Sequence, residues 1–167
     1  MTDPDAPRQA PDGCAAFIAY VRSYFEDLLQ KHAFGLVECL CLHEGRECTA
    51  LYQSPRQRLL FELSDGAFHV LIGSLTAPFP GGNQIDHAGR TGWYALFLLV
   101  EFKSGRRVYT EKLIQQIWNA QVDPYRFEAS LLAQWGDRVL PMFEPHQEEK
   151  WREEFRGCFP QKTPRRA

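Results

Sequence analysis

Apolar and polar residues alternate on both sides of Asp65-Gly66, over residues 58–73. An Asp-Gly pair between two β-prone runs favours a two-residue hairpin turn, because glycine adopts positive φ at low cost. Pairing the chain outward from this turn gives one face with no polar side chain, made of Leu59, Phe61, Leu63, Phe68, Val70 and Ile72. Such a face must be shielded from water, and we expect helices to cover it.

The other face of this hairpin is mixed and carries the first candidates for chemistry. The same register places Glu62 directly opposite His69, so a carboxylate and an imidazole share one side of the sheet. The pair either takes part in binding or is an ordinary half-exposed cross-strand pair, which adds roughly a few tenths of a kcal/mol.

A second hairpin is predicted from residues 36–43 and 46–53, with its turn at Glu44-Gly45. A short link, residues 54–57, joins it to the first hairpin, which predicts a four-stranded antiparallel meander. The register pairs Cys41 with Cys48. It also points four residues to one side of the sheet: Cys39, Cys41, His43 and Cys48.

These four side chains are the metal-ligating types, but their spacing limits what they can bind. Cys39 and His43 would lie about 13 Å apart along the strand, too far for one zinc ion to reach both. Cys41, His43 and Cys48 remain candidate ligands. The alternatives are small thiols packed like apolar side chains, or a Cys41–Cys48 disulfide. Because paired Cys-x-x-Cys turns are absent, we expect no metal and no other cofactor.

The chain is predicted to form one domain over residues 12–158. Residues 1–11 are polar and rich in proline, and we expect a flexible leader there; residues 159–167 are expected to form a flexible basic tail. Between positions 12 and 31, apolar residues recur at three- and four-residue steps. This period predicts a helix, with Asp12 as its cap.

Residues 93–102 form the most ambiguous segment. Thr91 is a possible cap, Gly105 a possible end, and the leucines favour a largely buried helix. The alternative is a strand paired with residues 106–109, because the period of a short apolar run does not distinguish the two.

Three more helices are predicted after this segment. The first covers residues 111–120, is capped by Thr110 and directs four apolar side chains inward: Leu113, Ile114, Ile117 and Trp118. The second starts at Pro124, after the capping residue Asp123, and ends at or bends before Pro141.

The last predicted helix, residues 147–156, is highly charged. It carries Trp151 and Phe155 four positions apart, and these two rings are expected to cover the core. The predicted fold is therefore α+β: an N-terminal helix, a four-stranded antiparallel meander, and three to four helices packed on one sheet face.

The segment from residue 77 to residue 92 has no periodicity and is long for a connection inside a domain. Loops of this length either serve binding or are solvated connectors. The sequence therefore suggests a ligand- or partner-binding site built from this loop, the mixed sheet face and two tryptophans: Glu62, His69, Asp86, His87, Arg90, Trp93 and Trp151.

Composition and motifs exclude several classes of protein. The net charge is −2, with acidic residues interleaved throughout, so nucleic acid is not an expected partner. The longest apolar run, residues 93–100, is too short to span a bilayer, so no membrane is expected. No phosphate-binding loop, nucleophile elbow or zinc-protease motif is present, and no catalytic residue is predicted.

A leading helix, a meander with the sharp hairpin FELSDG, and aromatic-rich helices resemble the plan of small bacterial accessory proteins, such as the immunity proteins that neutralise polymorphic toxins. Five cysteines, an odd number, and the lack of a secretory signal predict reduced thiols in a cytoplasmic protein. The lack of catalytic motifs and the aromatic residues near ends and loops, Tyr109, Trp118 and Trp151, favour a non-enzymatic domain that binds a protein partner. A small-ligand-binding domain or enzyme that uses residues 77–92, and a thiol-ligated metal protein, are the alternatives. The oligomeric state stays open.

Overall fold

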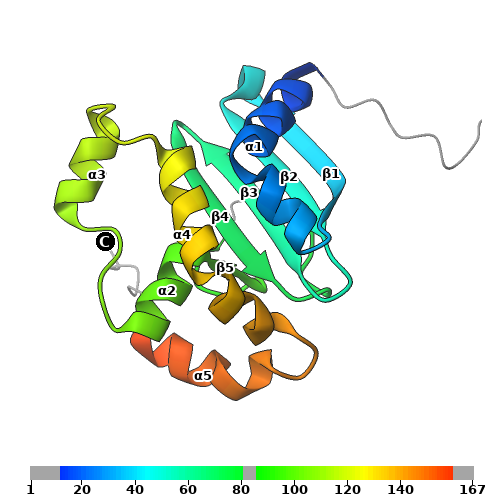
Figure 1. Ribbon diagram of the computed structural model, residues 1–167, viewed down its shortest axis with the longest axis vertical. Helices are drawn as coiled ribbons and strands as arrows, with labels where there is room; N and C mark the ends of the chain where they lie inside the picture. Colours follow the sequence, from blue (N-terminus) through cyan, green and yellow to red (C-terminus); the bar gives the residue numbers. More distant parts are fainter. Residues whose placement is uncertain (1–11, 81–85, 160–167) are drawn as a thin grey trace, which may run out of the picture.

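A computed structural model describes residues 12–80 and 86–159 of the 167-residue chain (Figure 1). The predicted leader, residues 1–11, and nearly all of the predicted tail lie outside the described residues. The elements are, in chain order, α1 (Asp12–Lys31), β1 (Gly35–Leu42), η1 (His43–Gly45), β2 (Glu47–Gln53), β3 (Arg58–Ser64), β4 (Ala67–Gly73), β5 (Trp93–Ala95), α2 (Leu96–Ser104), α3 (Glu111–Trp118), α4 (Pro124–Val139), η2 (Leu140–Phe143) and α5 (Glu148–Cys158).

The predicted hairpin at Asp65-Gly66 is confirmed. β3 and β4 pair antiparallel, with Phe61 opposite Val70 and the turn residues at φ 46° and 83°. All five strands follow one another in the order β1-β2-β3-β4-β5. The α+β class with an antiparallel meander is therefore as predicted, but the sheet has a fifth strand.

The fifth strand lies in the segment that the sequence left ambiguous. Residues 93–95 pair with β4, where Tyr94 lies opposite Ile72. The helix α2 then starts directly after Ala95 and ends at Gly105, which adopts φ 68°. Thr91 is therefore not the cap, and the strand does not pair with residues 106–109. Three residues are too few for a period to separate strand from helix.

The β1–β2 hairpin pairs Cys41 with Cys48, as predicted, but it is less regular than expected. The register shifts between Leu36 and Glu38. The turn is a short 3₁₀ segment in which His43 itself has positive φ. His43 therefore belongs to the turn and not to the strand that carries the cysteines.

Two helices cover the apolar sheet face. Figure 1 shows α1 and α4 lying across the same side of the sheet. Phe25 of α1 contacts Phe61 edge-on, with ring centroids 4.8 Å apart, and Tyr125 of α4 stacks on Phe68 at 4.0 Å. The prediction that helices shield this face is confirmed.

The opposite sheet face has a smaller apolar cluster of its own. Leu51, Leu60 and Leu71 are covered there by Ala77 and Trp93. The Trp93 indole donates a hydrogen bond to the carbonyl of Pro78 at 2.7 Å. The start of the long segment after β4 therefore packs over part of this face.

The C-terminal helix closes the main core at its lower end (Figure 1). Trp151 and Phe155 of α5 pack edge-on against Tyr94, with ring centroids 4.9 and 5.1 Å away. The Trp151 indole donates to the carbonyl of Met142, at 2.9 Å, in the η2 segment that follows α4. The predicted covering role of Trp151 and Phe155 is thus confirmed.

Helix α3 departs most from the prediction. Thr110 caps it by accepting from the Leu113 N–H at 3.2 Å, as expected. However, none of its apolar residues is buried: the exposed fraction is 85% for Trp118 and 42% for Ile114. The inward orientation predicted for this apolar face is wrong for Ile114 and Trp118, because α3 stands beside the sheet (Figure 1). Leu113 and Ile117 are half-buried.

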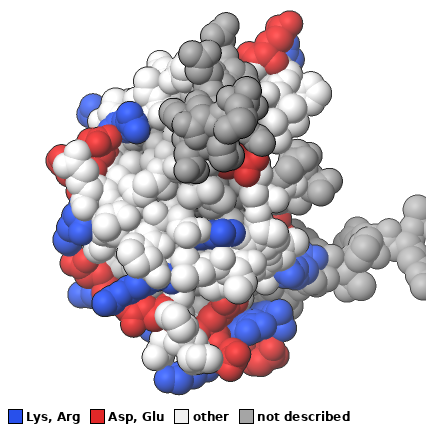
Figure 2. Space-filling view, turned by 90° about the vertical axis from the view of Figure 1, so that its right-hand side faces the viewer, with Lys and Arg blue, Asp and Glu red and all other residues white. Residues whose placement is uncertain are grey.

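Charged residues of both signs are mixed around the face shown in Figure 2, whose centre is largely uncharged. One ion pair joins two helices: the Lys31 ammonium of α1 lies 3.1 Å from the Asp137 carboxylate of α4. Among the residues that the structure describes, no helix has the length and apolar character needed to cross a bilayer.

Candidate functional site

Five polar side chains from distant parts of the chain form a continuous row, which we call the His–Glu row: Glu62, His87, His69, Glu128 and Tyr109. Glu62 Oε2 lies 2.6 Å from His87 Nε2. The His87 ring packs edge-on against the His69 ring, with centroids 5.1 Å apart. His69 Nδ1 lies 3.6 Å from Glu128 Oε1, which also accepts a hydrogen bond from the Tyr109 hydroxyl at 2.8 Å.

His87 reaches the sheet because the end of the long segment folds back on β5. The His87 carbonyl accepts from the Ala95 N–H at 2.9 Å, and the Gly89 N–H donates to the Trp93 carbonyl at 2.9 Å. Gly89 has φ 87°, and a Cβ atom there would overlap the ring of Tyr94. Glycine is therefore required at this position to bring His87 to Glu62.

Glu128 is fully buried, on the α4 face that packs against the sheet. A buried carboxylate is costly unless it is paired or hydrogen-bonded. Its partner Tyr109 is half-buried. Burial, followed by the nearby charge of Glu128 and the hydrogen bond to it, raises the pKa of Tyr109 well above its usual range. The Tyr109 hydroxyl is therefore a constant donor at neutral pH.

Tyr109 satisfies only part of the hydrogen-bonding capacity of this row. Within the described residues, neither Glu128 Oε2 nor His69 Nδ1 has a hydrogen-bond partner, although both atoms are buried. Buried polar atoms in native proteins are nearly always paired, so each exception calls for an explanation. Two such atoms next to each other leave this end of the row able to form further hydrogen bonds.

A cavity of about 460 Å³ opens beside this end of the row. His69 and Tyr109 form its polar floor, and its apolar wall includes Ile114, Ile117 and Trp118 of α3. The remaining lining residues are Asp65, Gly66, Ala67, Phe68 and Pro124. The uncovered face of α3 is thus one wall of a pocket whose floor contacts the buried Glu128.

The acidic side chains in and behind the lining of this pocket make it negative. Asp65 is the charged side chain in its lining, Glu128 lies directly behind the floor, and no lysine or arginine is among the described lining residues. Negative charge beside aromatic rings favours cations, which bind to carboxylates and to the faces of Trp and Tyr. The pocket can therefore hold an apolar group that ends in a positive charge or a hydrogen-bond donor.

The structure brings together three of the seven residues suggested from the sequence: Glu62, His69 and His87. Asp86 and Arg90 instead pair with each other, because Asp86 accepts from both the backbone N–H and the side chain of Arg90. Trp93 and Trp151 are core residues, with 1% and 9% of their surface exposed. Neither indole therefore offers a face to a partner.

Sequence reasoning missed Glu128, and it predicted an inward orientation for Trp118. One signal was present for Glu128: it precedes Leu131 and Leu132 by three and four positions, on the apolar stripe of its helix. An acidic residue at that spacing predicts a buried charge. No local pattern shows that Tyr109, between two helices, folds back onto it.

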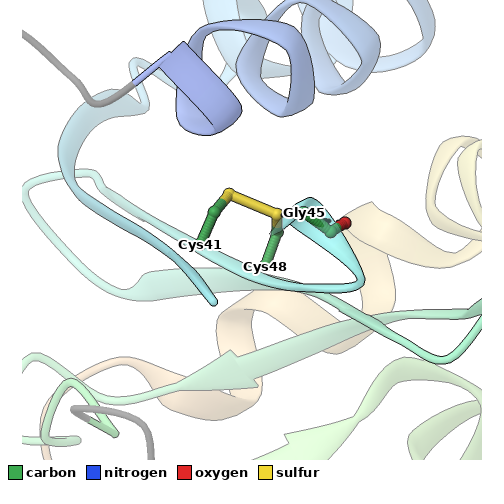
Figure 3. Close-up of a disulfide and its surroundings, with 3 residues drawn as sticks. All are labelled: Cys41, Gly45 and Cys48. Carbon is green, nitrogen blue, oxygen red and sulfur yellow. Dashed lines mark hydrogen bonds between the residues drawn. A yellow bond between two sulfur atoms is a disulfide. The ribbon is translucent and has the colours of Figure 1, made fainter. Parts of the chain in front are cut away.

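The cysteines form a second cluster near the opposite edge of the sheet. The predicted candidates Cys41 and Cys48 are joined by a disulfide, with Cys48 Sγ 3.7 Å from the carbonyl of Gly45 (Figure 3). The expectation that these two thiols are reduced is therefore wrong for this structure. His43 lies apart from them: its ring is largely exposed and approaches Glu47, with Nε2–Oε2 at 3.8 Å.

Two further cysteines, Cys14 and Cys39, adjoin the disulfide. Cys14 comes from the first turn of α1, which the sequence did not connect with the hairpin. Burial, followed by a hydrogen bond with Cys14, raises the pKa of the Cys39 thiol. The cluster thus contains a disulfide and two free thiols.

Comparison of the chain with protein-family models, with curated proteins and with solved structures found no match.

Proposed function

We propose that this protein is a non-enzymatic binding domain that acts in the cytoplasm by holding and covering a protein partner, as immunity proteins do. The observation that carries the proposal is the exposure of α3. Trp118 is 85% exposed on a helix whose apolar side chains are all unburied. A strongly amphipathic helix normally buries its apolar face, so this one is complementary to something outside the described chain.

Energetics favour a protein as that partner. Tryptophan is among the residues that most often dominate the binding free energy of protein interfaces, especially next to a pocket from which binding displaces water. Trp118 and Ile114 stand at such a pocket, and His69 and Tyr109 at its floor supply the polar contacts. The α3 surface therefore combines an aromatic anchor with a recess for a partner side chain.

The charge of the pocket suggests which side chain enters it. Lysine and arginine carry an apolar stem and a positive end. In the pocket, the stem would lie along Ile114 and Ile117, and the positive end would reach the floor in front of Glu128. We therefore propose a partner that inserts a basic side chain beside Trp118.

Affinity purification with the full chain as bait tests this proposal. The wild type is compared with Trp118→Ala and Asp65→Asn, and any captured protein is then produced separately for measurement of its Kd. We expect Trp118→Ala to weaken binding at least about 30-fold, the size of a typical interface anchor. Asp65→Asn should weaken it less, and more at low salt than at high salt.

Val37→Ser is the matched control. Val37 is also an exposed apolar residue, 55% accessible, but it lies on the edge strand β1 at the other side of the sheet. Equal binding by this control and the wild type supports the α3 surface. A captured partner that binds Trp118→Ala as tightly as the wild type would contradict the proposal, and so would the lack of any partner.

A small organic cation is the second candidate occupant. The cavity volume of about 460 Å³ lies within the range of small-molecule sites, and it has the usual apolar walls with a few polar groups. A thermal-shift screen with organic amines tests this function. A rise in Tm that Glu128→Gln abolishes would support a small ligand, whereas a flat screen with intact protein binding would exclude it.

A further inference from the structure

Three cysteine side chains from two elements converge at one point beneath the start of α1. The Sγ atoms of Cys14, Cys39 and Cys41 all lie within 4.8 Å of one another. A fourth sulfur, that of Cys48, is bonded to Cys41. Four cysteine sulfurs therefore lie close together. Figure 3 shows two of them, in the Cys41–Cys48 disulfide, below the start of α1.

This convergence is produced by the fold and not by a local motif. Cys39 and Cys41 are two positions apart on β1 and point to the same side, while Cys48 is the cross-strand neighbour of Cys41. α1 contacts this strand at Gly13, where a Cβ atom would lie 3.5 Å from the Cβ of Cys41, an ordinary van der Waals distance. Cys14, the next residue, is fully buried there.

The separation of the sulfurs fits one kind of ion. Zinc in structural sites binds four ligands in a tetrahedron with Zn–S bonds of about 2.3 Å, which places the sulfurs about 3.8 Å apart. The three sulfurs within 4.8 Å are close to that spacing already. Soft thiolates select zinc over magnesium or calcium.

We propose that the reduced protein binds one zinc ion through Cys14, Cys39, Cys41 and Cys48. The site lies at the β1 side of the sheet, whereas the α3 pocket lies beyond β4 at the other side, so the two proposals stand independently. The ion would join the first turn of α1 to the β1–β2 hairpin, as a structural zinc ion does.

Formation of the site is coupled to reduction of the disulfide. The Cys41–Cys48 disulfide accepts two electrons and two protons from a dithiol reductant, which is itself oxidised to a disulfide. The four resulting thiols then release four protons and bind one Zn²⁺ as thiolates. The oxidised and the zinc-bound forms therefore exclude each other, because Cys41 and Cys48 cannot serve both.

Metal titration of the full chain tests the proposal. The protein is reduced with a dithiol, freed of metal with a chelator, and titrated with Zn²⁺ under native mass spectrometry and with Co²⁺ under absorption spectroscopy. We expect one ion per chain, and Co²⁺ should give the intense visible bands of a tetrahedral site with thiolate-to-metal charge transfer. Co²⁺ spectra typical of six oxygen or nitrogen ligands, or no binding after reduction, would overturn it.

Single substitutions then identify the ligands. Cys14→Ser and Cys39→Ser should each weaken zinc binding by more than about 100-fold, since loss of a ligand exceeds the 10- to 100-fold effect of a supporting residue. Cys158→Ser is the matched control, because Cys158 is exposed and outside the cluster, and His43→Ala tests the histidine beside the hairpin. Both should leave the affinity unchanged.

Unchanged affinity in Cys14→Ser would overturn the four-thiolate site, and so would dependence on His43. Should a cysteine variant fail to fold, the Co²⁺ spectrum of the wild type still counts the thiolate ligands. The proposal would also be wrong if the reduced protein binds neither ion and the oxidised protein exchanges its disulfide among the four cysteines. The cluster would then be a thiol–disulfide relay and not a metal site.

Discussion

His69 on β4 and Glu128 on α4 approach to 3.6 Å, although they come from different layers of the fold and are 59 positions apart in the chain. The sequence pairs His69 with Glu62 across the hairpin, and their register is as predicted. In the structure each of these two residues turns to a different partner, Glu62 to His87 and His69 to Glu128. The two residues of this cross-strand pair are thus joined through His87, which lies between them in a longer polar row.

Substitutions of Glu128 measure how much this polar row contributes to the free energy of unfolding. Glu128→Gln keeps an acceptor for the Tyr109 hydroxyl and removes a buried charge that has no full partner, so we expect the free energy of unfolding to rise by about 1 kcal/mol. Glu128→Ala should lower it, by about 1–3 kcal/mol, because Tyr109 then loses its partner. Urea unfolding at pH 7 measures both. A Gln variant as unstable as the Ala variant would show that the charge itself stabilises the fold.

Gly89 tests how His87 is positioned. Gly89→Ala places a methyl group inside the ring of Tyr94 and strains a residue at φ 87°, so we expect a loss of at least about 2 kcal/mol in the free energy of unfolding. Gly45→Ala is the matched control, since Gly45 has φ 85° but open space around it, and it should cost about 1 kcal/mol. Equal losses in the two variants would mean that the Tyr94 contact does not determine the position of this segment.

Trp118 tests whether α3 contributes to the core. Because its side chain is 85% exposed, Trp118→Ala should change the free energy of unfolding by no more than about 0.5 kcal/mol. Leu132→Ala, at a fully buried position of α4, should cost about 2–5 kcal/mol. Thermal and urea unfolding of both variants give the comparison. A large loss in Trp118→Ala would place this ring in the core, as the sequence had predicted.

The half-buried phenol of Tyr125 makes the stability of the protein depend on pH in alkaline solution. Burial, with the charges of Tyr20 and Asp123 next in importance, raises the pKa of Tyr125 to about 12. An unfolded tyrosine ionises near about pH 10, so as the pH rises past that value the unfolded chain loses its proton first. The stability contributed by Tyr125 is therefore complete below about pH 10 and is lost as the pH rises towards 12.

Urea unfolding at a series of pH values measures this effect. Tyr125→Phe should flatten the fall in the free energy of unfolding over that window, since it removes one ionising group. A spectrophotometric titration of the phenols supplies the control: the folded protein should ionise at higher pH than the protein in urea. Identical slopes for variant and wild type would show that Tyr125 ionises alike in both states.

Local signals explain why some elements were predictable. Asp65-Gly66 sets its hairpin because the turn and the alternation around it agree on one register. Thr110 and Asp123 begin their helices through side-chain caps that depend on neighbouring residues alone. The strand at residues 93–95 was missed because it owes its form to pairing with β4.

The parts of the site that escaped prediction depend on contacts between distant segments. The pattern of α3 shows that one side is apolar, but it does not show whether another element covers it. Likewise Cys14 fits the stripe of α1, three positions before Phe17, and only the packing of α1 on β1 reveals the other sulfurs beside it. Tertiary packing, not local propensity, decides both outcomes.

The middle strand β3 has a hydrogen-bonded neighbour along each edge and an apolar cluster on each face. Its amide protons can reach water only when the whole domain opens, so deuterium uptake should be slowest there. Uptake in α3, which no core surrounds, should be fast under the same conditions. The slowest and fastest exchange are thus expected on different elements, β3 and α3, so that movement of α3 would leave the hydrogen bonds of the sheet intact.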